Sequence, residues 1–112
     1  MRQEKQRYIL FKIIRKDEKK NTLNKKSFLN VLWNRIWRYF GMKTAIKIGL
    51  WLLEFNIEKN YGIIRCSHST KEIMITSLSL IKEINHERII ISPIKTSGTL
   101  EKIREILTSN QI

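Results

Sequence analysis

Few side chains in this sequence could carry enzyme chemistry, and their spacing matches no usual catalytic or metal-binding pattern. Acid-base catalysis needs carboxylates or histidines that converge, yet Asp17 is the only aspartate and neither His68 nor His86 has an orienting partner nearby in sequence. Cys66 is the single cysteine, which excludes an internal disulfide and a multi-cysteine metal site. The four glycines form no phosphate-binding loop. We therefore expect no catalytic residue, no metal site and no cofactor bound by the protein itself.

Positive charge is the stronger chemical signal, and it is unevenly placed. The 112 residues include 22 Lys and Arg against 10 Asp and Glu, a formal net charge of +12. Residues 1–47 hold 14 basic and 3 acidic side chains, a net +11, whereas residues 48–112 hold 8 and 7, a net +1. This concentration favours a polyanionic partner, nucleic acid ahead of an anionic membrane surface.

The composition is that of one folded domain spanning residues 1–112. Hydrophobic residues make up 42% and the sequence has one proline and four glycines, so no long linker is expected. We expect residues 1–6 to form a flexible basic arm and residues 108–112 a frayed tail. No apolar stretch is long enough to span a membrane and no secretory signal is visible, which favours a cytoplasmic protein without a membrane partner.

The elements of the basic half are a strand and a helix. Residues 7–16 alternate like a strand, with Ile9 and Phe11 on one face. Asn24 is typical of a helix N-cap, and the helix that it opens should end at Gly41, because glycine commonly follows a helix C-terminus. The pattern leaves the conformation of residues 42–47 open.

A hairpin and a helix are expected next. Residues 48–56 and 62–66 read as strands joined by a short turn, so they should pair antiparallel. Ser69 and Glu72 have the S-x-x-E spacing of a capping box, which predicts a helix that runs to about Ile84.

A strand over residues 87–94 and a helix over residues 100–107 complete the order β-α-β-β-α-β plus a C-terminal helix. This order predicts an α+β fold, a ferredoxin-like or RRM-like sandwich whose four-stranded antiparallel sheet is covered on one face by two helices. The other face should also be apolar, and we expect the third helix, a second protomer or a partner subunit to cover it. The candidate partner-interface residues on that face are Tyr8, Leu10, Leu50 and Leu52.

The basic residues of the first half are the candidate RNA-binding site, because together they could neutralise phosphates. They are Arg15, Lys16, Lys19, Lys20, Lys25, Lys26, Arg35 and Arg38. The strand over residues 62–66 lacks the stacking aromatics of an RRM, which favours binding to duplex shape and phosphates over base readout. The pair Trp33 and Trp37 is more typical of a core than of a ligand platform. Ser97, Gly98 and Thr99 precede a helix, where they could cap it or hold a phosphate.

Four short stretches, taken in order, resemble one family. They are Arg-Tyr-Ile-Leu-Phe at residues 7–11, Phe-Gly at residues 40–41, Gly-Ile-Ile-Arg-Cys at residues 62–66 and Ser-Gly-Thr at residues 97–99. With this order and spacing, residues 7–107 resemble the ribonuclease P protein component 2 family, the archaeal small subunit shared with eukaryotic nuclear ribonuclease P.

The resemblance implies a non-catalytic subunit of the ribonucleoprotein that removes 5′ leaders from precursor tRNA. In that family the ribonuclease P RNA and its Mg²⁺ ions perform the hydrolysis, so contact with precursor tRNA would be indirect. It also implies pairing with a TIM-barrel-like subunit, component 3, and a homodimer within a heterotetramer. Arg65 and the Ser97–Thr99 turn are the positions that it connects with RNA or a partner. Glu101 departs from the family, whose members tend to be basic just after the turn.

Two other functions remain open on the sequence. A small ribosomal-type protein, or another protein that binds structured RNA, would need no catalytic RNA and no barrel subunit. A small metal-independent nuclease would cleave precursor tRNA without an RNA subunit.

Overall fold

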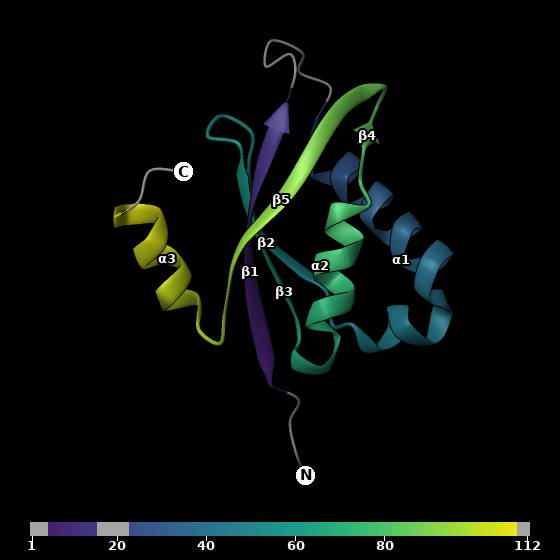
Figure 1. Ribbon diagram of the computed structural model, residues 1–112, viewed down its shortest axis with the longest axis horizontal. Coiled ribbons are helices and arrows are strands. Elements are labelled where there is room, and N and C mark those ends of the chain that lie inside the picture. The colour runs from purple at the N-terminus through teal and green to yellow at the C-terminus, as the bar shows by residue number, and fades with distance from the viewer. Residues whose placement is uncertain (1–4, 16–22, 110–112) are drawn as a thin grey trace.

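The computed structural model describes residues 5–15 and 23–109, which form a curled sheet with helices on both faces (Figure 1). The elements follow in the order β1 (Gln6–Arg15), α1 (Lys25–Lys47), β2 (Trp51–Asn56), β3 (Tyr61–Ser67), the 3-10 turn η1 (His68–Thr70), α2 (Lys71–Ser79), β4 (Glu83–Ile84), β5 (Glu87–Ser97) and α3 (Leu100–Ser109). In this described part no helix is long and apolar enough to cross a membrane.

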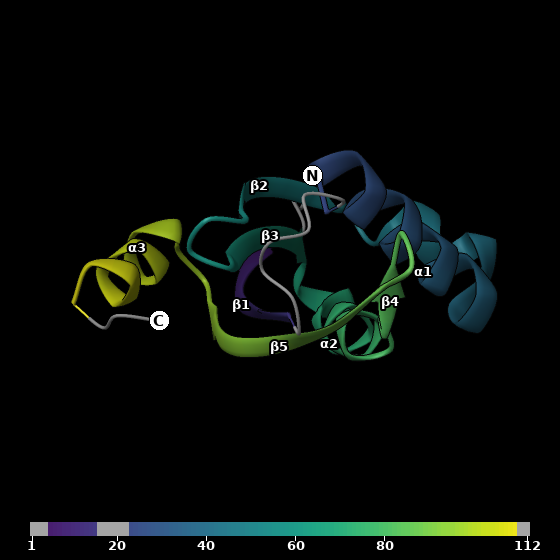
Figure 2. The same cartoon turned by 90° about the horizontal axis from the view of Figure 1, so that it is seen from above.

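The sheet has five antiparallel strands in the order β2-β3-β1-β5-β4, so the α+β class is confirmed and the expected count of four strands is wrong. The extra strand, β4, forms a tight hairpin with β5 through Asn85 and His86, whose φ angles are 52° and 67°. A two-residue turn of this kind requires left-handed backbone, which asparagine tolerates. Figure 2 shows how strongly the sheet curls between α3 and the other two helices.

The alternation in β1 is confirmed. Ile9, Phe11 and Ile13 are buried in the main core, which lies between the sheet and the helices α1 and α2. Leu10 points the other way and is buried in a smaller core against α3. Because β1 lies in the middle of the sheet, with β3 on one side and β5 on the other, it supplies side chains to both cores.

The long helix α1 begins as expected and continues past its expected end. The Asn24 side chain accepts a hydrogen bond from the backbone N–H of Ser27 at 2.9 Å, so Asn24 is the N-cap. Gly41 has φ 84° and ψ 175°, which breaks the helix at the predicted residue. Residues 42–47 then form a second helical segment beyond this kink, which settles the stretch that the sequence left open.

The structure around β2 shows that two candidate interface residues were assigned to the wrong face of the sheet. Leu52 is buried in the main core and Leu50 packs against that core, so neither lies on the face where the alternation placed them. A bulge between Leu52 and Glu54 causes this difference, because the extra residue lets Leu52 and Phe55 both face α1 and α2. Leu53 lies on the opposite face and packs against the smaller core.

The helix α2 is shorter than predicted. Its N-cap is Thr70, which makes no side-chain cap hydrogen bond, and the helix ends at Ser79. The Thr70 hydroxyl is instead 2.6 Å from the Ser67 hydroxyl and donates to the Ser67 carbonyl at 3.2 Å. Ser69 of the predicted capping box lies in the 3-10 turn over His68–Thr70, and Glu72 lies in the first turn of α2.

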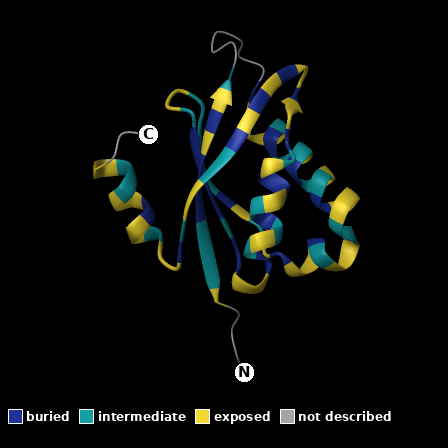
Figure 3. Cartoon of the chain, in the orientation of Figure 1, coloured by how far each residue is buried: buried dark blue, intermediate teal, exposed yellow. Residues whose placement is uncertain are grey.

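The third helix of this chain covers part of the second sheet face, and Figure 3 shows that α3 carries buried residues. Ile103 of α3 is fully buried against Leu10 and Ile63, and Tyr8 packs at the margin of this cluster. The candidate interface residues Tyr8 and Leu10 therefore contact their own chain's α3, and Leu10 is not available to a partner.

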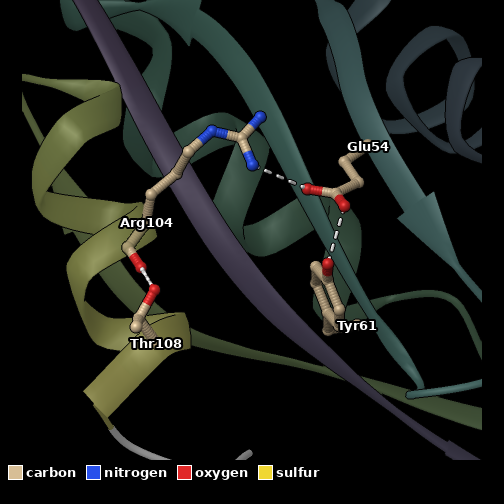
Figure 4. Close-up of polar contacts among 4 residues, drawn as sticks. All are labelled: Glu54, Tyr61, Arg104 and Thr108. Carbon is tan, nitrogen blue, oxygen red and sulfur yellow. Dashed lines mark hydrogen bonds and ion pairs between the residues drawn. The ribbon is translucent and has the colours of Figure 1, made fainter.

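A polar chain links α3 to the sheet (Figure 4). Arg104 donates to one carboxylate oxygen of Glu54 at 3.3 Å, and the Tyr61 hydroxyl donates to the other at 2.6 Å. Burial and this bond to the carboxylate raise the pKa of the Tyr61 hydroxyl. The helix continues through Thr108 and Ser109, so these two residues are helical where a frayed tail was expected. Residues 110–112 lie outside the described part.

Lys5 and Gln6, which were expected in a flexible N-terminal arm, are held by backbone hydrogen bonds of the fold. Gln6 is the first residue of β1, and the Lys5 carbonyl accepts a hydrogen bond from the backbone N–H of His68 at 2.7 Å. Residues 1–4 lie outside the described part of the chain.

Candidate nucleic-acid interface

The helix α1 carries six cations and no acidic residue over its 23 positions. Lys25, Lys26 and Arg38 are exposed and Arg35 is half-buried, on a helix whose inner face is fixed in the main core by Phe28, Leu32 and Ile36. The amphipathic pattern thus positions the cationic side chains by burying the apolar ones.

Arg35 and Arg38 are three residues apart and therefore neighbours on the helix surface. Arg35 donates to the Asn34 side-chain oxygen at 3.1 Å, and no ion pair joins either arginine to an acidic residue within the described ranges. Their charges are therefore not neutralised by described residues, which is what a phosphate-binding surface requires.

Two lysines that the site prediction omitted extend this surface. Lys43 and Lys47 are exposed on the helical segment beyond the Gly41 kink. The signal that could have found them is the acid-free stretch from residue 25 to residue 53, which the prediction did not follow past the expected helix end. We name the exposed or half-exposed cations of α1 the α1 cation surface: Lys25, Lys26, Arg35, Arg38, Lys43 and Lys47.

Arg15 does not belong to this surface, which corrects the prediction. Its side chain is 3% exposed and its Nε lies 2.8 Å from Oε1 of Glu87, whose side chain is also 3% exposed. A second contact joins Arg15 Nη2 to Glu87 Oε2 at 3.5 Å. This arginine is therefore a buried structural cation, while Lys16, Lys19 and Lys20 fall outside the described residues.

Arg65 lies on β3, on the sheet face that α3 partly covers, and is separate from the α1 cation surface. In the strand register it lies directly opposite Tyr8 of β1 and Trp51 of β2. Its guanidinium carbon lies 5.9 Å from the centre of the Trp51 ring, a cation–π contact.

The Ser97–Thr99 turn caps α3 with its own side chains. The Ser97 hydroxyl oxygen accepts from the Thr99 N–H at 3.2 Å, and the Thr99 hydroxyl oxygen accepts from the Lys102 N–H at 3.4 Å. These contacts support the capping role, and phosphate binding by Ser97, Gly98 and Thr99 stays a prediction.

The tryptophan pair on α1 divides between two environments. Trp33 packs against the main core, as expected, whereas Trp37 is 49% exposed. Tyr39 is exposed nearby in sequence, so the outer side of α1 presents aromatic rings as well as cations.

The candidate catalytic side chains are not brought together. Among the described residues, no three of His, Cys, Asp and Glu lie close enough to hold a metal ion. Cys66 is fully buried, and burial raises the pKa of its thiol to about 11, so the thiol is protonated at neutral pH. His68 and His86 are exposed, in η1 and in the β4–β5 turn.

The comparisons with known proteins agree on one family. The model of the Rpp14/Pop5 family matches residues 7–108. The chain is 34% identical over 101 residues to ribonuclease P protein component 2 of Pyrococcus furiosus, covering 90% of this chain and 81% of that protein. It is 31% identical over 101 residues to the protein of the same name from Methanocaldococcus jannaschii, covering 90% and 71%.

A solved structure shares the fold. A chain in the cryo-EM structure of yeast ribonuclease MRP superimposes with a TM-score of 0.71, covering 98% of this chain and 96% of that chain at 15% identity. The family match spans the described strands except Gln6 of β1, and α3 except Ser109, and it includes the four stretches on which the resemblance was based. The chain therefore belongs to the Rpp14/Pop5 family.

Proposed function

We propose that this chain is a protein subunit of ribonuclease P that assists the catalytic RNA in removing the 5′ leader from precursor tRNA. The observation that carries the proposal is the α1 cation surface, which combines six cations with no acidic residue on one helix. Membership in a family whose relatives are named ribonuclease P protein component 2 supports it.

The proposed mechanism is charge neutralisation. Cations of α1 would bind phosphates of the ribonuclease P RNA, so that RNA segments approach each other at a lower concentration of Mg²⁺. Hydrolysis would be carried out by the RNA and its Mg²⁺ ions, with no catalytic residue from this chain. Contact with precursor tRNA would be indirect, and the chain would work in the cytoplasm beside that RNA.

Reconstitution of precursor-tRNA cleavage tests this function. The catalytic RNA and its other protein subunits would be assembled with and without this chain, and the initial rate measured across a Mg²⁺ series. We expect the chain to shift the series towards lower Mg²⁺. A rate that does not depend on the chain at any Mg²⁺ concentration would favour the alternative, a structured-RNA-binding protein without a catalytic RNA partner.

A matched variant separates charge from fold. Replacing Lys25, Lys26, Arg35 and Arg38 by Ala should remove most of the Mg²⁺ shift, since these side chains face solvent or are half-exposed. The control replaces Lys59, Lys95, Lys102 and Arg104, four exposed cations outside α1, and should retain the shift. Cleavage by the purified chain alone, without any RNA subunit, would instead support a nuclease.

We further propose that a TIM-barrel-like component 3 binds on the sheet region that α3 leaves open. Ile14 and Ile90 are directly opposed in the β1–β5 register and are 45% and 57% exposed. They line a hollow of about 440 Å³ together with Lys82 and Arg88, which favours an apolar partner surface with acidic residues at its margin. A homodimer within a heterotetramer would use a different surface of this chain.

Co-purification tests the partner surface. Ile14→Glu or Ile90→Glu should prevent the chain from co-purifying with component 3, because each places a carboxylate in the apolar contact. Ile46→Glu is the control, since Ile46 is 76% exposed on α1, away from this hollow. Equal recovery of component 3 with all three variants would exclude this surface.

A further inference from the structure

One row of side chains crosses four strands of the sheet. Trp51 of β2 lies opposite Arg65 of β3, Arg65 lies opposite Tyr8 of β1, and Tyr8 lies opposite Ser97 of β5. Residues that are directly opposite in an antiparallel sheet point to the same face, so these four belong to the face that α3 partly covers. We name the outer part of this row, Trp51 and Arg65, the Trp51–Arg65 platform.

The Nε–H group of Arg65 lacks a hydrogen-bond acceptor among the described residues. Its nitrogen is buried. The contact with Trp51 orients the guanidinium through the face of the ring but satisfies none of its N–H donors. A buried donor without a partner is costly, so the Arg65 side chain gains from turning towards an acceptor that a ligand supplies.

Trp51 is exposed to an unusual degree for so large an apolar side chain. It is 59% exposed and lies at the start of β2, which is an edge strand of the sheet. Trp51 does not belong to the apolar cluster that packs under α3, so its ring is not covered by that helix. An indole that is held on one side and exposed elsewhere offers a stacking surface.

The electrostatic surroundings favour an anion. The four segments that carry the row, residues 5–15, 43–53, 61–71 and 92–100, contain no Asp or Glu, while each contains at least one Lys or Arg. The carboxylates that directly follow these segments are Glu54, Glu72 and Glu101, and Glu54 is already engaged by Tyr61 and Arg104.

We propose that the Trp51–Arg65 platform binds one unpaired nucleotide of an RNA strand, with its base stacked on Trp51 and its phosphate accepting hydrogen bonds from Arg65. This rests on the proposed function for the identity of the polyanion. An exposed aromatic ring beside an arginine fits a nucleotide better than an acidic peptide, whose carboxylates need the cation alone. Bases inside a duplex stack on each other, so the platform requires a single-stranded or bulged position.

This site differs in kind from the α1 cation surface. Phosphate neutralisation by α1 does not depend on whether the bases are paired, whereas stacking on Trp51 requires an unpaired base. The same protein would thus distinguish a single-stranded RNA from a duplex of equal charge. The stacking aromatic would come from β2, not from β3, where an RRM carries it.

Binding of short RNAs to the full chain tests the proposal. We would measure fluorescence anisotropy of a labelled single-stranded hexaadenylate and of a labelled RNA duplex with the same number of phosphates. Trp51→Ala should weaken binding of the single strand by about ten-fold or more and leave the duplex unchanged. Ile94→Ala, which removes another exposed large apolar side chain, from β5, is the control and should change neither.

A second measurement reports the stack itself. In a chain with Trp33→Phe and Trp37→Phe, Trp51 is the only remaining tryptophan, and its emission should be quenched by the single strand but not by the duplex. Arg65→Ala should weaken binding of the single strand, and Arg65→Lys should restore only part of it, because lysine lacks the planar fork. The circular dichroism melting curve of each variant checks that it is folded.

The outcomes separate this proposal from the one on which it rests. Unchanged single-strand affinity in Trp51→Ala, or Trp51 emission that does not respond to the single strand, would overturn the platform while duplex binding by α1 remains. Failure of the unmodified chain to bind either RNA would overturn the platform and the proposed RNA-binding function together.

Discussion

Gly62 of β3 lies directly opposite Phe11 of β1, and the Phe11 ring fills the space that a side chain at Gly62 would need. A Cβ at this position would lie 2.7 Å from Phe11 Cε2, closer than such atoms approach. Phe11 in turn stacks on Phe28 of α1, with 5.3 Å between ring centres. The glycine therefore permits the contact through which the sheet holds α1.

We expect Gly62→Ala to lower the free energy of unfolding by about 1–3 kcal/mol, because the Phe11 ring must move within a filled core. Urea unfolding measures this. Gly98→Ala is the control, since its Cβ would meet only the tip of the Arg7 side chain at 3.4 Å. If both variants unfold at the same urea concentration, Phe11 does not restrict residue 62.

Removing one partner of the buried Arg15–Glu87 pair should be more damaging than removing both. Glu87→Leu leaves the Arg15 charge buried without its carboxylate and should cost about 3–5 kcal/mol of unfolding free energy, measured with urea. The double variant Arg15→Met with Glu87→Leu should recover much of that loss. Arg104→Ala, at the exposed pair, should cost less than about 1 kcal/mol.

Stability should fall at high pH because of the buried Cys66 thiol. Its pKa is raised from 9.0 to about 11 in the fold, so folding favours the protonated thiol. This contribution is fully present below the unfolded pKa of 9.0 and is lost as the pH rises through about 11. Burial raises the pKa of Tyr61 as well, which adds to the loss in the same direction.

Melting temperatures measured across this pH range check the thiol contribution. Cys66→Ala should be less stable at neutral pH because of the cavity, yet its stability should decline less steeply at high pH. A decline as steep as that of the unmodified chain would assign the pH dependence to other groups.

The α1 cation surface predicts a salt effect on RNA binding. Arg35→Ala with Arg38→Ala should reduce the slope of log affinity against log salt for an RNA duplex by up to about two, because each phosphate contact releases counterions. Lys102→Ala with Arg104→Ala removes the same charge from α3 and should leave the slope unchanged. A slope unaffected by the α1 pair would exclude these arginines from the interface.

Local signals in the sequence predicted much of the fold. The alternation of β1 and the Asn24 cap depend on neighbouring residues, and both are confirmed. The bulge after Leu52 inverted the faces of β2, because a bulge depends on pairing with β3 that no local pattern reveals. The β4–β5 hairpin was missed because Asn85 and His86 look like the end of a helix until their left-handed backbone is seen.

The candidate site was predicted only in part, because some of its features depend on residues that are distant in sequence. Exposed cations on α1 follow from helical periodicity, so Arg35 and Arg38 are found where they were expected. Burial of Arg15 depends on Glu87, which is 72 residues away in sequence. The cation–π contact of Arg65 with Trp51 likewise depends on strand register, so charge counting could not separate Arg15 from Arg65.

The absence of acidic residues from α1 has a thermodynamic consequence. The positive end of the helix dipole coincides with Lys25 and Lys26, and no Glu–Lys pair offsets the repulsion along the helix. The folded helix brings these cations together, so a polyanion that binds the folded chain more tightly than the unfolded one links binding to folding. RNA should therefore raise the melting temperature of the protein, and the strain stored in α1 becomes part of the affinity.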